Sequence, residues 1–222
     1  MRPYNKFIRF TLVVLLLWSA ISCQTAIEVD GNLAEWPEGY FLRGLTAPWN
    51  QIPKDSTSFQ TFVDEEYLFF NFRTVDKTPF TVPFESELSV AAGDRVELFF
   101  SKTQDMSEDY YCLEMNPRGE VLDYRATYYR KFDYDWDAST LELATEEYPD
   151  GYQVEGRVKI NELQELGLGN EFYLGVYRAE YRGKDQVTWY SWIVPDAENP
   201  DFHIPSSLAR VKFAENAIEP VY

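Results

Sequence analysis

The chain has 222 residues, which suits one domain with a targeting segment, or two small domains at most. It carries 37 Asp and Glu against 20 Lys and Arg, a formal net charge of −17. This negative charge disfavours nucleic acid and anionic lipid as partners, and it leaves neutral or cationic ligands such as neutral polysaccharide or calcium.

The N-terminus has the order of residues typical of a bacterial lipoprotein signal. Three basic residues come first, an apolar run follows over 10–18, and small residues lead into Cys23. The apolar run is too short to span a bilayer comfortably. We therefore expect residues 1–22 to be a signal peptide and Cys23 to be the lipidated first residue of the mature protein. The alternative is an ordinary secretory signal cut nearby, with Cys23 an incidental thiol.

This interpretation has consequences for location and for disulfide bonds. Residues 23–25 are then the lipid anchor and a short linker, and the protein is exported to the bacterial cell envelope, at the outer membrane or cell surface. The lipid is its only contact with the membrane. Cys112 lies within a predicted strand and has no partner if Cys23 is lipidated, so no intramolecular disulfide is expected.

About nine or ten short segments alternate between apolar and polar residues with the period of two that is typical of strands. In chain order they are 58–64, 66–76, 93–100, 110–116, 120–129, 141–145, 152–158, 171–182, 188–194 and 208–213. Turn residues separate several of them, as at 64–66, 116–119 and 149–151. Residues 37–58 and 77–92 read as loops, and 214–222 as a loose tail.

One short helix is predicted over 160–167, with Asn161 as its cap and Gly167 as its end. Short strands at regular spacing indicate an all-β fold, an antiparallel β-sandwich of immunoglobulin-like or jelly-roll-like type. We expect a single domain over residues 26–213.

Two strand carboxylates, Glu97 and Glu114, lie among apolar and aromatic neighbours. A carboxylate in such a place needs a charged partner or a ligand. As ligand-binding groups they would accept hydrogen bonds from sugar hydroxyls. The structural alternative pairs them across strands with Arg95, Arg125 or Arg178.

Several phrases in the chain, taken in order, resemble carbohydrate-binding module family 9, in particular its exported family 9-like proteins. They are VDGNLAEW, EEYLFFNF, GDRVELFF, YYCLEMNPRGEVLD, DGYQVEGRVKI, and WYSW followed by DFHIPSSLARVKF. The resemblance covers nearly the whole mature chain. It implies a β-sandwich that binds sugars, commonly at chain ends, through stacked aromatic rings and hydrogen bonds to hydroxyls.

The resemblance also implies a set of sugar-binding residues, namely Glu97, Tyr111, Glu114, Arg178, Trp192, Phe202 and His203. The best-studied branch of the family holds the sugar between two tryptophans, one of them shortly before the strand that carries Glu97. This chain has Val90-Ala91-Ala92 there, which implies an altered pocket.

Aromatic residues make up 17% of the chain. Trp189 and Trp192 are three apart on a strand and point to opposite faces, so one belongs to the core and the other could be a sugar platform. Tyr134 and Trp136, in the acidic phrase DYDWD, suit either ligand contact or a calcium-binding loop.

The function expected is non-catalytic binding of polysaccharide or oligosaccharide, in support of glycan capture or catabolism and alongside glycosidases or other glycan-utilisation proteins. No cofactor is expected with certainty, and calcium is compatible with the acidic loops. One rival function is glycoside hydrolysis by Glu97 with a second carboxylate. Another is haem-based electron transfer, with ligands drawn from Met106, Met115 and His203.

Overall fold

The computed structural model describes residues 27–37, 41–50 and 57–221. The predicted signal peptide, Cys23 and the linker lie outside the described residues. Within the described part of the chain, no helix is long and apolar enough to cross a membrane.

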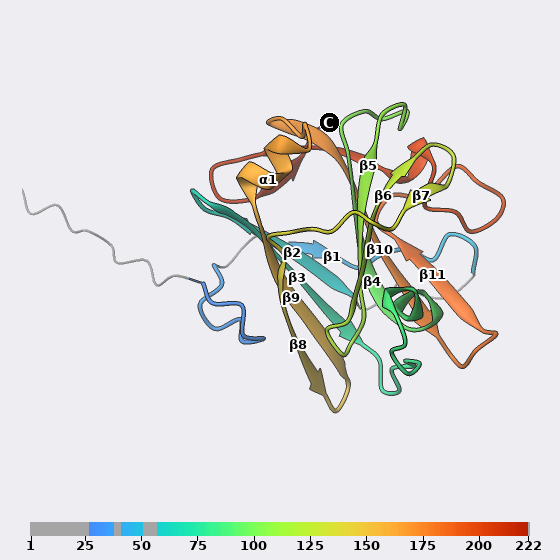
Figure 1. Ribbon diagram of the computed structural model, residues 1–222. Coiled ribbons are helices and arrows are strands. Elements are labelled where there is room, and N and C mark those ends of the chain that lie inside the picture. Colours follow the sequence, from blue (N-terminus) through green and yellow to red (C-terminus); the bar gives the residue numbers. More distant parts are fainter. Residues whose placement is uncertain (1–26, 38–40, 51–56, 222) are drawn as a thin grey trace, which may run out of the picture.

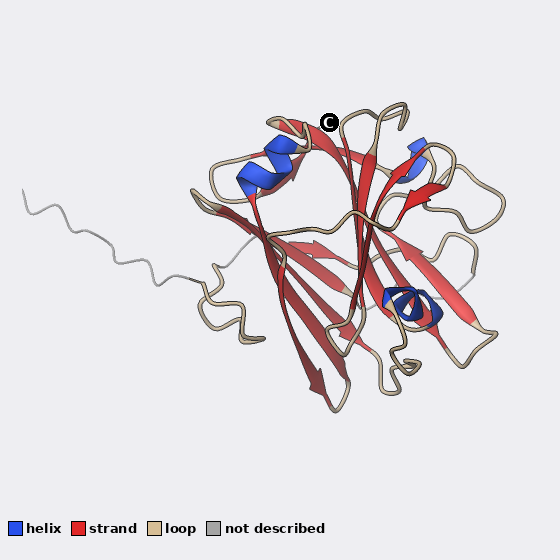
Figure 2. Ribbon diagram, viewed as in Figure 1, coloured by secondary structure: helices blue, strands red, loops and turns tan. Residues whose placement is uncertain are grey.

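Two antiparallel sheets pack face to face (Figures 1 and 2). The first sheet has five strands, in the order β1 (Phe41–Arg43), β2 (Ser58–Val63), β3 (Tyr67–Val75), β9 (Gly151–Lys159) and β8 (Glu142–Tyr148). The second sheet has eight strands, and its main path runs β13 (Ile218–Pro220), β12 (Ala209–Phe213), β10 (Glu171–Tyr181), β4 (Arg95–Ser101), β5 (Tyr110–Met115), β6 (Val121–Thr127) and β7 (Lys131–Asp133). Strand β11 (Val187–Ser191) pairs with β10 off this path. The predicted antiparallel β-sandwich is therefore confirmed.

Three short helical segments join the strands. They are η1 (Glu87–Ala92), α1 (Ile160–Glu165) and η2 (Pro205–Ser207). Helix α1 lies where the sequence predicts it, but it begins at Ile160, and its N-cap is Lys159 rather than Asn161. Gly167 follows it with φ +84°, a left-handed conformation that glycine adopts without strain.

Three predicted loop or tail segments contain more structure than expected. Strand β1 lies in 37–58, helix η1 in 77–92, and strand β13 in 214–222, where it pairs with β12. The last segment is thus not a loose tail, and its Ala217 is buried. Strands β1 and β13 are three residues long, too short for a period of two to be visible in the sequence.

The main core lies between the sheets and is built from alternate residues of each strand. From the second sheet it receives Val96, Leu98, Phe100, Leu113 and Met115, and from the first sheet Phe70, Phe72 and Val154. The outer face of the second sheet is also covered. Residues Phe99, Tyr110, Cys112, Tyr124 and Tyr177 form a second cluster there with Val90 of η1 and with Phe202 and Leu208 of the loop after β11.

The N-terminal phrase VDGNLAEW is fixed to the outer face of the first sheet by Glu155 of β9. The buried Glu155 carboxylate accepts hydrogen bonds from Gly31 N at 2.7 Å and from Trp36 Nε1 at 2.7 Å. Gly31 has φ +85°, as the turn at this point requires. Two of the phrases that carry the family resemblance, VDGNLAEW and DGYQVEGRVKI, are thus in contact with each other, and this contact stabilises the fold rather than forming a ligand site.

Candidate functional site

A pocket of about 210 Å³ opens on the outer face of the second sheet, where the covering cluster leaves part of strands β4 and β5 uncovered. Its walls come from η1, the β6–β7 hairpin, β11 and the loop after β11. It is lined by Leu88, Ala91, Arg95, Glu97, Glu114, Leu122, Tyr124, Arg130, Phe132, Tyr134, Trp189, Pro200, Asp201, Phe202 and His203.

Three charged side chains form the floor of the pocket. Glu97 and Glu114 are direct cross-strand partners on β4 and β5, and Arg95 lies two residues before Glu97, on the same face. The Arg95 Nε lies 2.5 Å from Glu114 Oε2 and 3.0 Å from Glu97 Oε1. The floor therefore brings two carboxylates to one guanidinium, all three side chains being buried.

The two carboxylates are bonded differently. Glu114 accepts the Nε–H of Arg95 and also the hydroxyl of Tyr124 at 2.8 Å. The Nε atom of arginine carries a single hydrogen, and here it points to Glu114. Glu97 Oε1 is consequently buried without a hydrogen bond from any described residue, although the guanidinium is close. A buried acceptor left in this state costs free energy unless a ligand or water supplies a donor.

Burial and the neighbouring Glu114 carboxylate raise the pKa of Glu97 to about 8, while the Arg95 charge acts in the opposite direction. The floor is then close to neutral at pH 7, with one cation, one carboxylate and one carboxylic acid. A carboxylic acid offers an O–H donor as well as an acceptor, a combination that suits a hydroxyl group.

Aromatic rings form one wall of the pocket. The Trp189 ring meets Phe202 edge-on at 5.6 Å, and Phe202 stacks on Tyr177 at 4.1 Å and 9°. The hydroxyl of Tyr177 bonds Ser207 Oγ at 2.7 Å, which fixes the stack to helix η2. The guanidinium of Arg95 lies 5.3 Å from the centre of the Trp189 ring. Phe202 and Arg95 thus both pack against Trp189.

The opposite rim belongs to the β6–β7 hairpin and is tied to the loop after β11. The Asp201 carboxylate accepts hydrogen bonds from Arg130 Nη1 at 2.9 Å, from the Tyr129 hydroxyl and from the His203 backbone N–H at 2.9 Å. Arg130 has φ +57°, an uncommon conformation for a residue other than glycine. Its guanidinium is held by Asp201 at the mouth of the pocket.

His203 lies in the wall below this rim. Its Nδ1 is 3.0 Å from the Tyr110 hydroxyl, and its ring packs against Phe99 and Phe132. Burial, together with the charge of Arg130, lowers the pKa of His203 to about 3. The side chain is therefore a neutral imidazole at pH 7.

Four of the seven predicted site residues line this pocket: Glu97, Glu114, Phe202 and His203. The structure does not bring the other three to it. Tyr111 belongs to the inter-sheet core, where it packs on Trp136, because it has the opposite strand parity to Glu114. Trp192 also packs against the inter-sheet core, whereas Trp189 lies on the opposite face of the sheet and lines the pocket.

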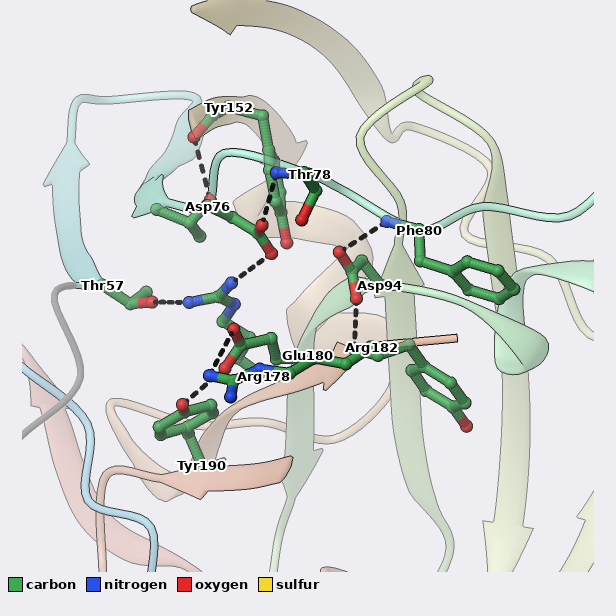
Figure 3. A network of polar contacts seen from close by, with 12 residues as sticks. Thr57, Asp76, Thr78, Phe80, Asp94, Tyr152, Arg178, Glu180, Arg182 and Tyr190 are labelled. Carbon is green, nitrogen blue, oxygen red and sulfur yellow. Dashed lines mark hydrogen bonds and ion pairs between the residues drawn. The ribbon is translucent and has the colours of Figure 1, made fainter. Parts of the chain in front are cut away.

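Arg178 belongs to a separate polar network between the sheets (Figure 3). It bonds Thr57 Oγ1 at 3.2 Å and Asp76 Oδ2 at 2.9 Å, and it is 1% exposed. Asp94 lies nearby and accepts the backbone N–H groups of Phe80 and Tyr181 (Figure 3). Arg178 therefore connects β10 to the ends of β2 and β3, away from the pocket.

Three charged residues of the pocket are absent from the predicted set of sugar-binding residues. Arg95 enters the sequence prediction only as a possible salt-bridge partner, and Arg130 and Asp201 do not enter it. Asp201 comes directly before Phe202 and His203 in the DFH phrase, so its position next to two predicted site residues could have identified it from the sequence. Arg130 follows an ordinary strand, and nothing in its sequence context marks it.

Among the described residues, one cluster of three acidic side chains could hold a cation. Glu87, Asp123 and Asp137 each place a carboxylate oxygen within 4.8 Å of the others. Burial, and to a smaller extent the neighbouring acids, raises the pKa of Glu87 and of Asp123. Oxygen ligands of this kind suit calcium, but Asp123 Oδ2 already accepts the N–H of Ala138 at 2.6 Å. Calcium binding stays a prediction.

The three residues suggested for haem do not all lie on one face of the second sheet. Met115 lies in the inter-sheet core, whereas Met106 belongs to the cluster on the outer face, and His203 packs against Phe99 of that cluster. Met115 and His203 cannot bind one iron across the sheet.

Comparisons with known proteins agree with this fold. No protein-family model matches the chain, and no curated protein matches it. Among solved structures, a Bacteroides uniformis protein provisionally described as carbohydrate-binding has a TM-score of 0.64 at 16% identity, with 78% of this chain and 86% of that one covered.

Two structures of a family 9 carbohydrate-binding module from Caldicellulosiruptor kristjanssonii are also similar. The complex with glucose has a TM-score of 0.57 at 15% identity, over 84% of this chain and 91% of that one. The complex with cellotriose has a TM-score of 0.60 at 16% identity, over 89% and 95%. The chain thus has a family 9-like fold, as the sequence resemblance implies.

Proposed function

We propose that this protein is a non-catalytic carbohydrate-binding module that takes a sugar unit into the pocket on β4 and β5. The observation that carries the proposal is Glu97 Oε1, a buried acceptor without a hydrogen bond in a pocket that the Trp189 ring also lines. A pyranose offers hydroxyl groups at its edge and C–H groups on its faces, so it fits polar groups on a floor beside aromatic rings on a wall. The sugars bound by the family 9 modules with this fold support the same ligand class.

The size of the pocket fits a small ligand. Its volume of about 210 Å³ is below the range of about 300–1,000 Å³ that is common for drug-sized ligands. One sugar unit is the natural occupant. The near-neutral floor favours a neutral sugar over a charged one, because a net charge there would lack a counter-charge.

The proposal includes the cellular setting. A lipid anchor at Cys23 would hold the module on the cell envelope, where it would capture glycan for glycosidases or other glycan-utilisation proteins. The order of basic, apolar and small residues before Cys23 supports export.

The test is a glycan array followed by calorimetric titration of the sugars that bind. Glu97→Ala removes both the donor and the acceptor of the carboxylic acid, and Trp189→Ala removes one aromatic ring of the wall. We expect each to weaken binding about tenfold or more. The matched control is Glu165→Ala on the exposed side of α1, which should bind as the wild type does. Absence of binding to every glycan by a folded wild-type protein would refute the proposal.

The carboxylate pair supports a second candidate, a retaining glycoside hydrolase. Glu97 and Glu114 both contact one Arg95 nitrogen, and the raised pKa of Glu97 suits a general acid. Retaining enzymes hold two carboxyl groups about 5–5.5 Å apart on either side of the scissile bond. Here both lie side by side on the floor, and Glu114 is already bonded to Arg95 and Tyr124. Binding therefore ranks first, and release of reducing sugar that Glu97→Gln abolishes would reverse the order.

A further inference from the structure

The β6–β7 hairpin exposes aromatic rings beside the mouth of the pocket, two at its tip and one directly after β7. Tyr128, Tyr129 and Tyr134 are 47%, 48% and 43% exposed, and they are among the most exposed large apolar side chains of the described residues. Tyr134 lines the pocket itself, and Arg130, the residue after Tyr129, lines it as well. Exposed aromatic rings gathered at one place on a surface commonly mark a binding site.

The hairpin tip is held in position before any ligand arrives. The Tyr129 hydroxyl and the Arg130 guanidinium bond the two oxygens of the Asp201 carboxylate, and the Arg130 guanidinium also lies 5.8 Å from the Tyr129 ring centre. Asp201 is 72 residues from Tyr129 along the chain, so these bonds join the hairpin to the loop after β11 (Figure 1). The Tyr128 and Tyr129 rings meet edge-on at 5.4 Å.

From this geometry we propose that Tyr128 and Tyr129 form an outer subsite, which stacks on the second sugar unit of a glycan whose first unit occupies the pocket. The inference rests on the proposed function and adds to it that the ligand is an oligosaccharide leaving the pocket over the hairpin tip. The pocket has room for one unit. Tyr129 lies next to its lining, since it bonds Asp201, and the Tyr128 ring packs against the Tyr129 ring. Because Asp201 fixes the tip in advance, stacking there loses little conformational entropy on binding.

The role of each side chain differs. Tyr128 makes no hydrogen bond with its hydroxyl among the described residues, and its ring is free to stack. Tyr129 contributes a ring and, through its hydroxyl, a bond that orients the tip. Arg130 and Asp201 lie between the pocket and the rings, where they would meet the glycosidic link and adjacent hydroxyls.

The test compares sugars of one, two and three units from matched gluco-, xylo-, manno- and galacto-oligosaccharide series, titrated calorimetrically against the full-length protein. For the series that binds, the wild type should bind the disaccharide about fivefold to tenfold more tightly than the monosaccharide. In Tyr128→Ala and Tyr129→Ala the ratio of the two affinities should fall to about one. Tyr129→Phe should keep most of the ratio, because it keeps the ring.

The matched control is Tyr148→Ala on β8, in the other sheet, which should leave the ratio at its wild-type value. An unchanged ratio in both tyrosine variants would overturn the outer subsite, and so would a wild type that binds the monosaccharide and the disaccharide equally. Either result leaves the pocket as a monosaccharide site and the proposed function standing. Failure of every sugar to bind overturns the proposed function and the outer subsite together.

Discussion

Glu97 and His203 line one pocket, and burial shifts their pKa values in opposite directions. Both side chains are buried, and burial disfavours the charged form of each. For an acid this raises the pKa, and for an imidazole it lowers it. Both groups are therefore uncharged at pH 7, which leaves Arg95, Glu114, Arg130 and Asp201 as the charges at the site.

Glu97 should make the folded protein less stable as the pH rises. The carboxyl group keeps its proton to about pH 8 in the folded state but loses it near 4.5 when unfolded. Between these values the folded state binds more protons, so the free energy of unfolding falls with rising pH. Glu97→Gln should remove this contribution, and its stability relative to the wild type should rise from about pH 5 to about pH 9 in urea denaturation. A difference independent of pH would contradict the raised pKa.

His203 should act in the acid range and with the opposite sign. The unfolded imidazole gains a proton below about 6.5, whereas the folded one resists protonation to about 3. The contribution of His203 to stability is present above pH 6.5 and is lost as the pH falls below it. In His203→Gln the loss of stability between about pH 6.5 and pH 4 should be shallower than in the wild type, measured by thermal melts across that range. Parallel curves for the two proteins would count against a neutral buried His203.

At the scale of elements, close packing of β3 on β9 depends on a glycine. A Cβ atom at Gly156 would lie 2.3 Å from Phe70 Cζ, and Phe70 is fully buried between the sheets. The strand can carry a ring over this position because Gly156 has no side chain. The same strand carries Glu155, which fixes the N-terminal phrase on the outer face.

Gly156→Ala should therefore destabilise the protein, by about 1–3 kcal/mol, because Phe70 must leave its preferred position in a packed core. Urea denaturation of the purified variant measures this loss. The control is Gly169→Ala, where the nearest atom to an added Cβ is 4.0 Å away, and which should change stability little. Equal stability of the two variants would show that the core adapts to the added carbon without cost.

At the scale of the whole molecule, polar contacts as well as the apolar core hold the two sheets together. Arg178 of the second sheet reaches Asp76 and Thr57, which adjoin strands of the first sheet (Figure 3). The side chains of Arg178 and Asp76 are 1% and 7% exposed, so their ion pair is largely desolvated. This accounts for an arginine that the family resemblance assigned to sugar binding.

Arg178→Met should destabilise the fold by about 3–5 kcal/mol, since it leaves the Asp76 charge buried without its partner. Arg178→Met combined with Asp76→Asn should recover part of this loss, because the second change removes that charge. Sugar affinity of any folded variant should be close to that of the wild type, as measured by calorimetry. If Arg178→Met lost sugar binding while its stability was unchanged, Arg178 would have to be a sugar-binding residue.

The proposed anchor makes a prediction about the location of the whole protein. Cys23→Ser should block lipidation and move the protein from the membrane fraction to the soluble exported fraction. Fractionation of cells that express each form, with detergent partitioning, measures the change. A wild-type protein that is already soluble would favour the ordinary secretory signal.

The sequence by itself determined which side chains share a strand face. Alternation placed Glu97 with Arg95, and it set Tyr111 apart from Glu114 even though the family motif grouped the two. It also separated Trp189 from Trp192. These inferences hold because successive side chains of a strand point to opposite sides wherever the strand lies.

Only the tertiary structure decided which face meets the other sheet and which carries the pocket. A period of two is the same for both faces of a strand. It could not show whether Trp189 or Trp192 lines the pocket, nor that Arg178 pairs with Asp76 rather than with a ligand. The bond between Tyr129 and Asp201 joins residues 72 apart, and such contacts depend on how sheets and loops pack. The residues on the floor of the pocket could thus be predicted from two adjacent strands, whereas the residues of its walls could be found only from the tertiary structure.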